Sequence, residues 1–213
     1  MEKILLKDKN LIFIDFDGTI KNSDNVKAKA FIKIFGNKIN ATTKNKIKNH
    51  HYRNLGVSRF NKIPIYLNWN GLLDTKKNIY KYNKKFSKVT IKEVCLSKWI
   101  PGAKKFITSN KDKKLILITA TPKKEIKIIL KKLNIYDYFY KIYGSPIIKS
   151  EVVREVLNKI KIEKNKCLYI GNSLSDYYAA KKNLITYINI GKIKNFKKKY
   201  NFIKNFNLID QSI

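Results

Sequence analysis

The sequence predicts an α/β fold with a Rossmann-like, three-layer α/β/α core around a parallel sheet and an inserted α-helical segment. Short, continuous apolar runs bounded by turn residues recur along the chain, as expected of strands that are buried on both faces. Segments with apolar residues at helical spacing separate these runs, and this alternation is typical of parallel sheets covered by helices. A length of 213 residues allows one domain with an insertion, or two small domains.

The first expected strand is the apolar run LIFID at residues 11–15, which is followed shortly by the turn signal Gly-Thr. The run with the weakest strand pattern is FYKIYG at residues 139–144. The other expected strands are KLILIT at 114–119, KCLYIG at 166–171 and ITYINI at 185–190.

Helices are expected between these strands. An apolar stripe from Ile126 to Leu133 predicts one helix, which Thr121 is placed to cap and Pro122 is placed to begin. Further helices are expected over residues 102–111, 151–160 and 175–183.

Residues 22–98 break the alternation and are interpreted as a helical insertion. They contain a turn-rich stretch at 61–74 (NKIPIYLNWNGLLD) and no convincing buried strand. Helical segments within them are expected at residues 26–36, 42–53 and 76–96. The predicted division is a core domain of residues 1–21 and 99–213 with a helical domain of residues 22–98 inserted into it.

The formal net charge is +32, from 47 basic and 15 acidic residues. The lysines are spread over the whole chain, including residues 192–204, which are expected to be a solvated, partly helical end. Abundant Asn, Ile, Tyr and Phe beside Lys are typical of AT-rich codon usage, so we do not expect nucleic acid as a partner. A positive surface still raises the encounter rate with an anionic substrate.

The sequence gives no sign of a membrane or secreted protein. No apolar run has the length of a membrane span, and the first residues lack a signal-peptide pattern. The two cysteines, Cys95 and Cys167, lie far apart and have no metal-binding spacing. We therefore expect the chain in the reducing cytoplasm.

Polar and charged residues follow the expected strands at the points where they end. These residues are Asp15, Asp17, Thr119, Lys149, Asn172 and Asp176. The carboxyl ends of parallel strands meet at one edge of the sheet, and ligands collect there. We therefore expect these side chains to form one site.

Asp15 and Asp17 are the most informative pair, because residues two apart in an extended chain face the same side. Gly18 then permits a sharp turn, and Thr19 can satisfy backbone groups in it. Two carboxylates can divide the work between a nucleophile and a general acid and base. They also provide the oxygen-rich environment that Mg²⁺ prefers.

Four motifs carry a resemblance to a known family. DFDGT at residues 15–19 resembles the first motif of the haloacid dehalogenase superfamily, whose members are mostly phosphohydrolases. LILITAT at 115–121 resembles the second motif, Lys149 before a helix the third, and YIGNSLSDYYAAKKNLI at 169–185 the fourth. The helical insertion resembles the cap that phosphoglycolate-phosphatase-like members carry between the first two motifs. The resemblance covers roughly residues 10–190 and implies the same core fold.

The resemblance implies a role for each matching residue. Asp15 would attack phosphorus and form an aspartyl-phosphate. Asp17 would protonate the leaving oxygen and then activate the water that hydrolyses the intermediate. Thr119 would hydrogen-bond the phosphoryl oxygens, and Lys149 would balance the charge on the nucleophile and the transferring group. Phosphoryl transfer depends mostly on such positioning and cationic stabilisation.

Mg²⁺ is the implied cofactor, held by Asp15, the backbone carbonyl of Asp17 and the fourth motif. That motif usually begins with Asp and here begins with Asn172. An amide oxygen lacks the negative charge, so three outcomes are open: metal binding is weaker, Asp176 takes over directly or through water, or the site is partly disabled. The metal-free dehalogenase branch also places Asn near this position but lacks the second aspartate, so Asp17 favours a phosphatase.

Substrate contacts are expected from the cap and from the first two motifs. The stretch NHHYRNLGVSRFNKI at residues 49–63 gathers both histidines and two of the few arginines of the chain. It also resembles a bacterial subgroup associated with building surface polysaccharides, whose presumed substrates are phosphorylated sugars or small polyols. The residues expected to contact substrate are Gly18, Thr19, His51, Ser58, Arg59, Lys62 and Ala120.

The predicted activity is Mg²⁺-dependent hydrolysis of a small phosphorylated metabolite, such as a sugar, polyol or amino-alcohol phosphate, by a monomer or a homodimer. Three alternatives remain open. A catalytically weakened binding protein would explain Asn172, and a phosphatase acting on nucleotides or nucleic-acid ends would explain the charge. A phosphotransferase or mutase would use the same motifs with a different acceptor.

Overall fold

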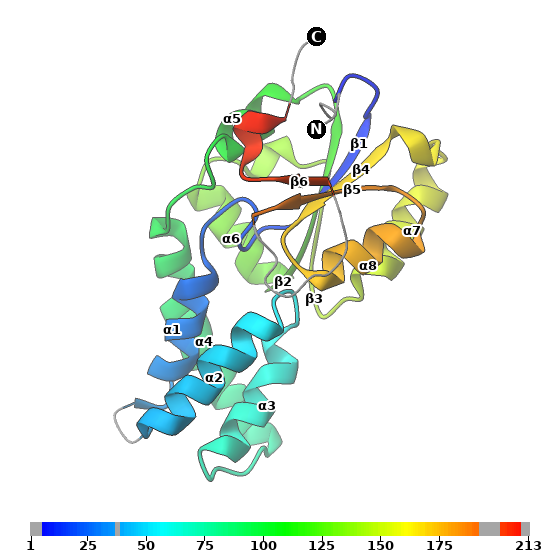
Figure 1. The fold of residues 1–213 in the computed structure, drawn as a ribbon. Helices are drawn as coiled ribbons and strands as arrows, with labels where there is room; N and C mark the ends of the chain where they lie inside the picture. Colours follow the sequence, from blue (N-terminus) through cyan, green and yellow to red (C-terminus); the bar gives the residue numbers. More distant parts are fainter. Residues whose placement is uncertain (1–5, 37–38, 192–200, 210–213) are drawn as a thin grey trace.

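The computed structural model describes residues 6–36, 39–191 and 201–209 (Figure 1). The strands are β1 (Leu11–Ile14), β2 (Lys114–Pro122), β3 (Lys141–Ser145), β4 (Cys167–Gly171), β5 (Thr186–Ile190) and β6 (Asn201–Ile203). The α-helices are α1 (Asp24–Lys33), α2 (Ala41–Arg53), α3 (Arg59–Trp69), α4 (Lys76–Leu96), α5 (Ala103–Ser109), α6 (Lys123–Lys132), α7 (Lys149–Ile160) and α8 (Leu174–Lys182). Short 3₁₀ helices are η2 (Tyr136–Tyr138), η3 (Lys164–Lys166) and η4 (Phe206–Leu208).

The strands form one parallel sheet in the order β3-β2-β1-β4-β5-β6. Strand β1 lies inside the sheet, between β2 and β4. Its last residue, Ile14, is level with Leu117 of β2 and Ile170 of β4. The residues that follow β1 therefore lie beside the carboxyl ends of both neighbouring strands, where a site is expected in a parallel sheet.

Each face of the sheet carries its own apolar cluster, so the core has three layers. Ile12 and Ile14 of β1 pack in the cluster that includes residues of α5 and α6. Leu11 and Phe13 point the opposite way and pack in the cluster that includes residues of α7 and α8. All four side chains are fully buried, as the continuous apolar run predicts. The predicted α/β/α fold with a parallel sheet is confirmed.

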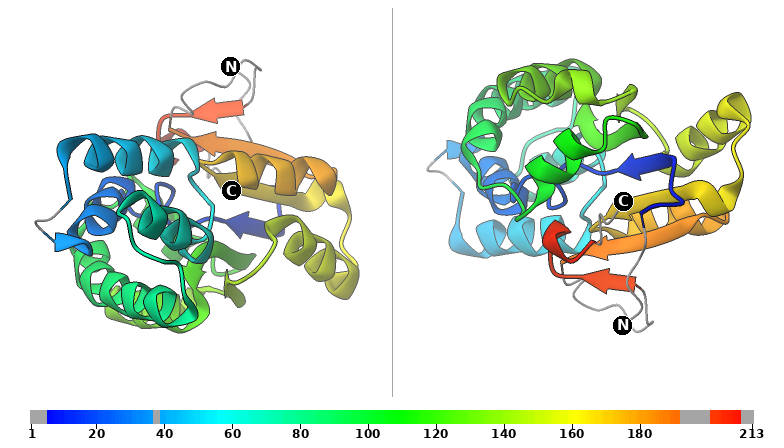
Figure 2. Two further views of the ribbon diagram at one scale, coloured as in Figure 1. Left: turned by 90° about the horizontal axis from the view of Figure 1, so that it is seen from below. Right: turned by 90° about the horizontal axis from the view of Figure 1, so that it is seen from above.

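Helices α1–α4 lie in sequence between β1 and β2, and they gather on one side of the molecule, away from α7 and α8 (Figure 1; Figure 2). They share an apolar cluster of their own. Phe31 is central to it, with ring centroids 4.2 Å from Phe86 and 5.1 Å from Tyr66. We call these four helices the cap. The exact division of the chain at residues 22 and 98 stays a prediction.

One segment of the cap is a helix where turns were expected. Residues 61–74 were expected to be rich in turns, and helix α3 covers 59–69 with Pro64 inside it. The missing N–H of Pro64 falls in the second turn, where one bond is lost. Ile63, Tyr66 and Leu67 are fully buried against the other cap helices, and this packing outweighs that loss.

Two smaller expectations also need correction. Thr121 does not cap the helix that follows, because α6 begins at Lys123 with Pro122 as its N-cap and no side-chain cap. The end of the chain is not helical at residues 201–203, which form the edge strand β6 beside β5. The rest of the lysine-rich segment, residues 192–200, lies outside the described residues.

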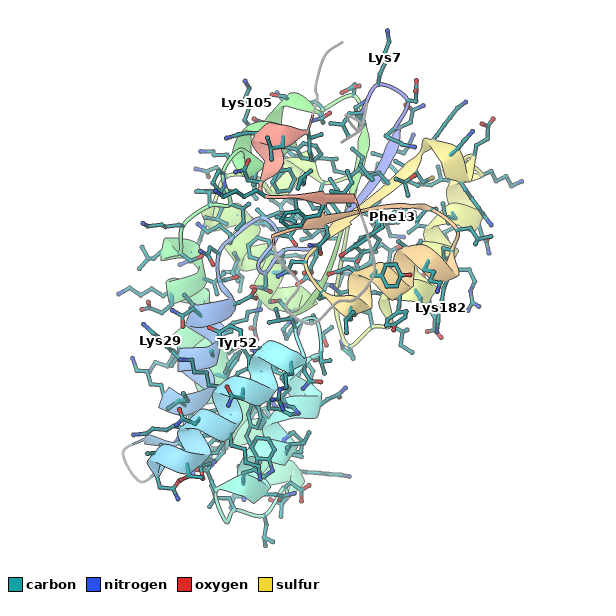
Figure 3. All side chains as sticks on the ribbon, in the orientation of Figure 1. Lys7, Phe13, Lys29, Tyr52, Lys105 and Lys182 are labelled. Atoms are coloured by element: carbon teal, nitrogen blue, oxygen red, sulfur yellow. The ribbon has the colours of Figure 1, made fainter. Side chains whose placement is uncertain are left out.

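Lysine side chains point outward from several parts of the molecule (Figure 3). Lys29 lies on the cap, whereas Lys7, Lys105 and Lys182 lie on different parts of the core, and all four are exposed. The positive charge is thus distributed over the described surface, in agreement with its spread along the sequence.

Candidate active site

One lysine lies between two buried carboxylates, of which one directly follows β1 and the other lies in α8, the helix after β4. The ammonium group of Lys149, the first residue of α7, lies 2.9 Å from Oδ1 of Asp15 and 2.6 Å from Oδ1 of Asp176. All three residues are buried, and the two carboxylates raise the pKa of Lys149 against the opposing effect of burial. Lys149 therefore remains charged beside the Asp15 carboxyl group.

Asp176 is held from both sides. Besides Lys149, Oδ1 accepts a hydrogen bond from the Tyr169 hydroxyl at 2.9 Å. Oδ2 accepts from the backbone N–H of Ser173, which is one bond of the capping box at the start of α8, and also from the Ser173 hydroxyl. With both oxygens engaged and no exposure to solvent, Asp176 is built to fix Lys149.

Asp15 is the residue that directly follows β1. Its backbone N–H donates to the carbonyl of Ile170 in β4 at 3.0 Å, which continues the sheet and fixes its direction. Burial raises the pKa of Asp15 to about 7, with Lys149 acting in the opposite direction. A positive partner is therefore needed to keep this carboxyl group in its nucleophilic, ionised form.

Asp17 has a different environment, centred on a lysine of the cap. Lys27 of α1 pairs with Oδ2, which also accepts from the Thr121 hydroxyl at 3.0 Å. Ser23 donates to Oδ1 at 2.6 Å. Burial raises the pKa of Asp17, but Lys27 and these hydrogen bonds more than offset it, so the pKa lies below its usual value. The two aspartates thus have opposite pKa shifts, and the low pKa of Asp17 means that Lys27 opposes its protonation before a substrate binds.

The end of β2 places residues 119–121 beside the two aspartates. The fully buried Thr119 hydroxyl accepts from the backbone N–H of Thr121 at 3.1 Å. Its own hydrogen can still be donated to a ligand. Ala120 and Thr121 line the same cavity as Asp15 and Asp17.

The amide of Asn172 lies between the first motif and the cap. Its Oδ1 accepts from the Thr19 hydroxyl at 3.4 Å, and its Nδ2 donates to Oδ2 of Asp24 at 3.1 Å. Burial, assisted by Asp17, raises the pKa of Asp24 to about 6. Gly18 has a positive φ of 74°, which only glycine adopts without strain, and Asn172 and Asp24 fill the space beside it.

The cavity above these residues has a volume of about 50 Å³ and is shared between core and cap. Asp15, Asp17 and Ala120 line it from the core, whereas His51 and Lys62 line it from the cap. Lys62 is almost fully buried, and within the part of the chain that the structure describes no carboxylate lies within ion-pairing distance of it. Burial lowers its pKa to about 7.

The neighbouring histidine is fixed in one tautomer. Nε2 of His51 lies 3.1 Å from the carbonyl oxygen of Asp24, so it must carry the hydrogen. Nδ1 then accepts from the ammonium of Lys62 at 3.2 Å. Burial, with the charge of Lys62, lowers the pKa of His51 to about 3, so the ring is neutral.

Two residues expected to contact substrate have protein partners instead. Both terminal nitrogens of Arg59 bind the carboxylate of Glu125 in α6, and Ser87 of α4 donates to the same carboxylate. The Ser58 hydroxyl lies 2.6 Å from that of Ser145 at the end of β3. Arg59 still lines the cavity, but these contacts connect the cap to the core.

The oxygen donors at the end of β1 fit a hard divalent cation. Oδ1 of Asp15 is taken by Lys149, which leaves its other oxygen, and the backbone carbonyl of Asp17 follows two residues later. Among the described residues, no three His, Cys, Asp or Glu side chains form a metal-binding group by themselves. Mg²⁺ is usually held by one or two carboxylates with several waters and substrate phosphate oxygens, so it does not need such a group.

The sequence matches one family over most of its length. Residues 11–190 match the family of haloacid dehalogenase-like hydrolases. The chain belongs to this family. The prediction of an enzyme of the haloacid dehalogenase type is thereby confirmed.

Several solved structures have the same fold at low sequence identity. One is a β-phosphoglucomutase from Clostridium difficile, with a TM-score of 0.71, 18% identity, and coverage of 95% of this chain and 94% of that one. Another is a predicted phosphoglycolate phosphatase from Haemophilus somnus, with a TM-score of 0.70, 18% identity, and coverage of 87% and 86%. A predicted phosphatase from Clostridium acetobutylicum has a TM-score of 0.68, 19% identity, and coverage of 93% and 94%. A comparison with curated protein sequences gave no match.

Several residues of this hydrolase's site were not foreseen from the sequence. They are Ser23, Asp24, Lys27, Thr121 and Glu125. Asp24 had a usable signal, because Asp15, Asp17 and Asp24 fall within ten consecutive residues of a chain with few acidic residues. Lys27 had no such signal, because it is one of many lysines in the chain. In the described part of the chain, no helix has the length and apolar character needed to cross a membrane.

Proposed function

We propose that this hydrolase is a Mg²⁺-dependent phosphatase that cleaves a small phosphate monoester through an aspartyl-phosphate on Asp15. The observation that carries the proposal is the Asp15–Lys149–Asp176 arrangement, with Asp15 and Asp17 both lining one cavity. It provides a nucleophile with a fixed cation and a second carboxyl group in a different environment. Membership of the haloacid dehalogenase-like hydrolases supports the same chemistry.

In the first step an oxygen of Asp15 forms a bond to phosphorus while the bond from phosphorus to the leaving oxygen breaks. Asp17, in its protonated form, gives its proton to that oxygen. Lys149 stays beside Asp15 and stabilises the negative charge of the transferring group. Thr119 and the backbone at Ala120 hold the phosphoryl oxygens.

In the second step Asp17, now ionised, takes a proton from a water molecule that attacks phosphorus. The bond between Asp15 and phosphorus breaks, and inorganic phosphate leaves. Asp15 and the carbonyl of Asp17 would help to hold Mg²⁺, which when bound would offset the phosphate charge. Asp17 thus gives a proton to the leaving oxygen in the first step and takes one from water in the second.

The cap sets the size and polarity of the substrate. A cavity of about 50 Å³ beneath a closed cap favours a small leaving group over a nucleic-acid end. Lys62 and His51 offer a cation and a neutral ring to the leaving group, and the hydroxyl-rich groups of a sugar, polyol or amino-alcohol phosphate match them. Two free cysteines are compatible with our proposal of a cytoplasmic enzyme.

The test is phosphate release from a panel of sugar, polyol, amino-alcohol and nucleotide monophosphates, with Mg²⁺ and with EDTA. We expect turnover with Mg²⁺ that is lost with EDTA and in Asp15→Asn. Release that persists in Asp15→Asn would contradict the covalent mechanism. Folded wild-type protein without turnover on any compound would favour the alternative of a binding protein.

A further inference from the structure

The orientation of the Asn172 amide identifies which of its atoms faces the site. An ionised carboxylate can only accept hydrogen bonds, so the atom of Asn172 that lies 3.1 Å from Oδ2 of Asp24 is its NH₂ nitrogen. The amide oxygen then faces the Thr19 hydroxyl at 3.4 Å. Toward Asp24, residue 172 therefore acts as a hydrogen-bond donor and not as an oxygen ligand.

Asp24 lies where an acidic ligand would be useful. It is the first residue of α1, and it lines the same cavity as Asp15 and Asp17. A Cβ atom at Gly18 would lie 2.4 Å from Oδ2 of Asp24 and 1.9 Å from Nδ2 of Asn172. The carboxylate thus packs directly against the backbone that follows Asp17, whose carbonyl is an expected metal ligand.

A purely structural role explains little of this arrangement. No cation lies within ion-pairing distance of Asp24 among the described residues, because Lys27 on the same helix pairs with Asp17. The helix dipole accounts for an acidic residue in the first turn, and an exposed one would serve equally well. Oδ1 of Asp24 has no hydrogen-bond donor among the described residues, and it keeps its lone pairs for a ligand.

We propose that Asp24 replaces the aspartate missing at position 172 as the second acidic ligand of the metal site, with Asn172 holding it in place. The metal site then has two carboxylates, Asp15 and Asp24, and the carbonyl of Asp17. This restores the negative charge that an amide at position 172 removes. The proposal rests on the Mg²⁺ dependence proposed above. It adds one metal ligand that comes from helix α1 of the cap.

The test is Mn²⁺ binding, measured by the loss of the free-ion EPR signal without any substrate. We expect Asp24→Asn to weaken Mn²⁺ binding by about 10-fold or more. Asn172→Asp in the Asp24→Asn background should return the affinity toward the wild-type value, because the charge is moved back to position 172. Asp74→Asn, which removes an exposed carboxylate of the cap, should bind Mn²⁺ as the wild type does.

Unchanged affinity in Asp24→Asn, or a double variant that stays as weak as the single one, would overturn the proposal. If Asp24→Asn does not fold, anomalous scattering from a wild-type crystal grown with Mn²⁺ decides the matter. We expect the ion within bonding distance, about 2.2 Å, of an Asp24 oxygen. An ion bound to Asn172 and not to Asp24 would refute it.

These outcomes are separate from those of the proposed function. Mg²⁺-dependent turnover with normal Mn²⁺ affinity in Asp24→Asn would leave the phosphatase in place and remove only the role of Asp24. A wild-type protein that binds no Mn²⁺ overturns the role of Asp24. Turnover that EDTA does not affect would remove the metal from the proposed mechanism.

Discussion

Arg59 of the cap and Glu125 of the core form a bidentate ion pair, and both residues line the cavity. Both side chains are largely buried, and Ser87 from a second cap helix donates to the same carboxylate. The contact brings α3 and α4 onto α6, and the Ser58–Ser145 hydrogen bond adds a second connection. In this structure the cap is therefore closed over Asp15 and Asp17.

Breaking this pair should open the cap. Glu125→Gln keeps the size of the side chain but loses the charge, and we expect a loss of about 1–3 kcal/mol in the free energy of unfolding. The KM of the best substrate should rise, because the closed form is less populated. Urea unfolding and steady-state kinetics measure the two effects. The control is Glu155→Gln, which removes an exposed ion pair with Lys159. Equal effects from both variants would show that the Arg59–Glu125 pair does not hold the cap on the core.

Lys27 should matter for proton transfer more than for binding. It holds the Asp17 carboxylate together with Ser23 and Thr121, so Lys27→Met should lower kcat by about 10- to 100-fold with little change in KM. A substrate with a good leaving group, such as p-nitrophenyl phosphate, needs no proton in the first step and should lose less when that step limits turnover. Lys29→Met changes an exposed lysine of the same helix and should have wild-type kinetics. Equal losses on both substrates would assign Lys27 a different role.

The sheet and its catalytic edge could be predicted because both depend on short stretches of sequence. The run before Asp15 is buried on both faces and apolar at every position, and a parallel sheet brings the ends of its strands together. Lys149 could be assigned by its place at the start of a helix after a strand, and it contacts Asp15 as expected.

The contacts between cap and core could not be predicted, because no local pattern fixes how an inserted helix packs on a sheet. Lys27 reaches Thr121 across 94 positions of sequence, and Arg59 reaches Glu125 across 66. Helix α3 was missed for a related reason. Pro64 favours a turn locally, whereas burial of Tyr66 and Leu67 in the cap favours the helix.

Lys62 should make stability and binding depend on pH in opposite ways. Its folded pKa of about 7 is below its usual 10.5, because burial and Lys27 disfavour the charge more than Asp24 and Asp17 favour it; His51 beside it stays neutral. Between these values the unfolded chain binds more protons, so the contribution of Lys62 to stability rises as pH increases from about 7 to 10.5. Binding of an anionic leaving group should weaken as pH rises through about 7, because the folded protein loses the ammonium there.

Lys62→Met should remove both trends. Urea unfolding at a series of pH values would show a flatter rise in stability than the wild type, and the KM for an anionic leaving group would lose its dependence on pH. Lys84→Met, at an exposed position of α4, should keep both trends. A variant with the wild-type pH dependence would show that Lys62 is not the titrating group.

Lys149 should be essential to folding as well as to catalysis. Lys149→Met leaves Asp15 and Asp176 buried without a cation, and removal of one partner from a buried pair costs about 3–5 kcal/mol. Without Lys149, burial and the neighbouring Asp176 raise the pKa of Asp15 unopposed, so the folded protein binds more protons than the unfolded chain near neutral pH. The variant should therefore gain more stability than the wild type as pH falls toward 5, because Lys149 of the wild type lowers the pKa of Asp15. Urea unfolding at several pH values measures the difference. A Lys149→Met protein as stable as wild type at pH 8 would show that Asp15 and Asp176 do not depend on this ion pair.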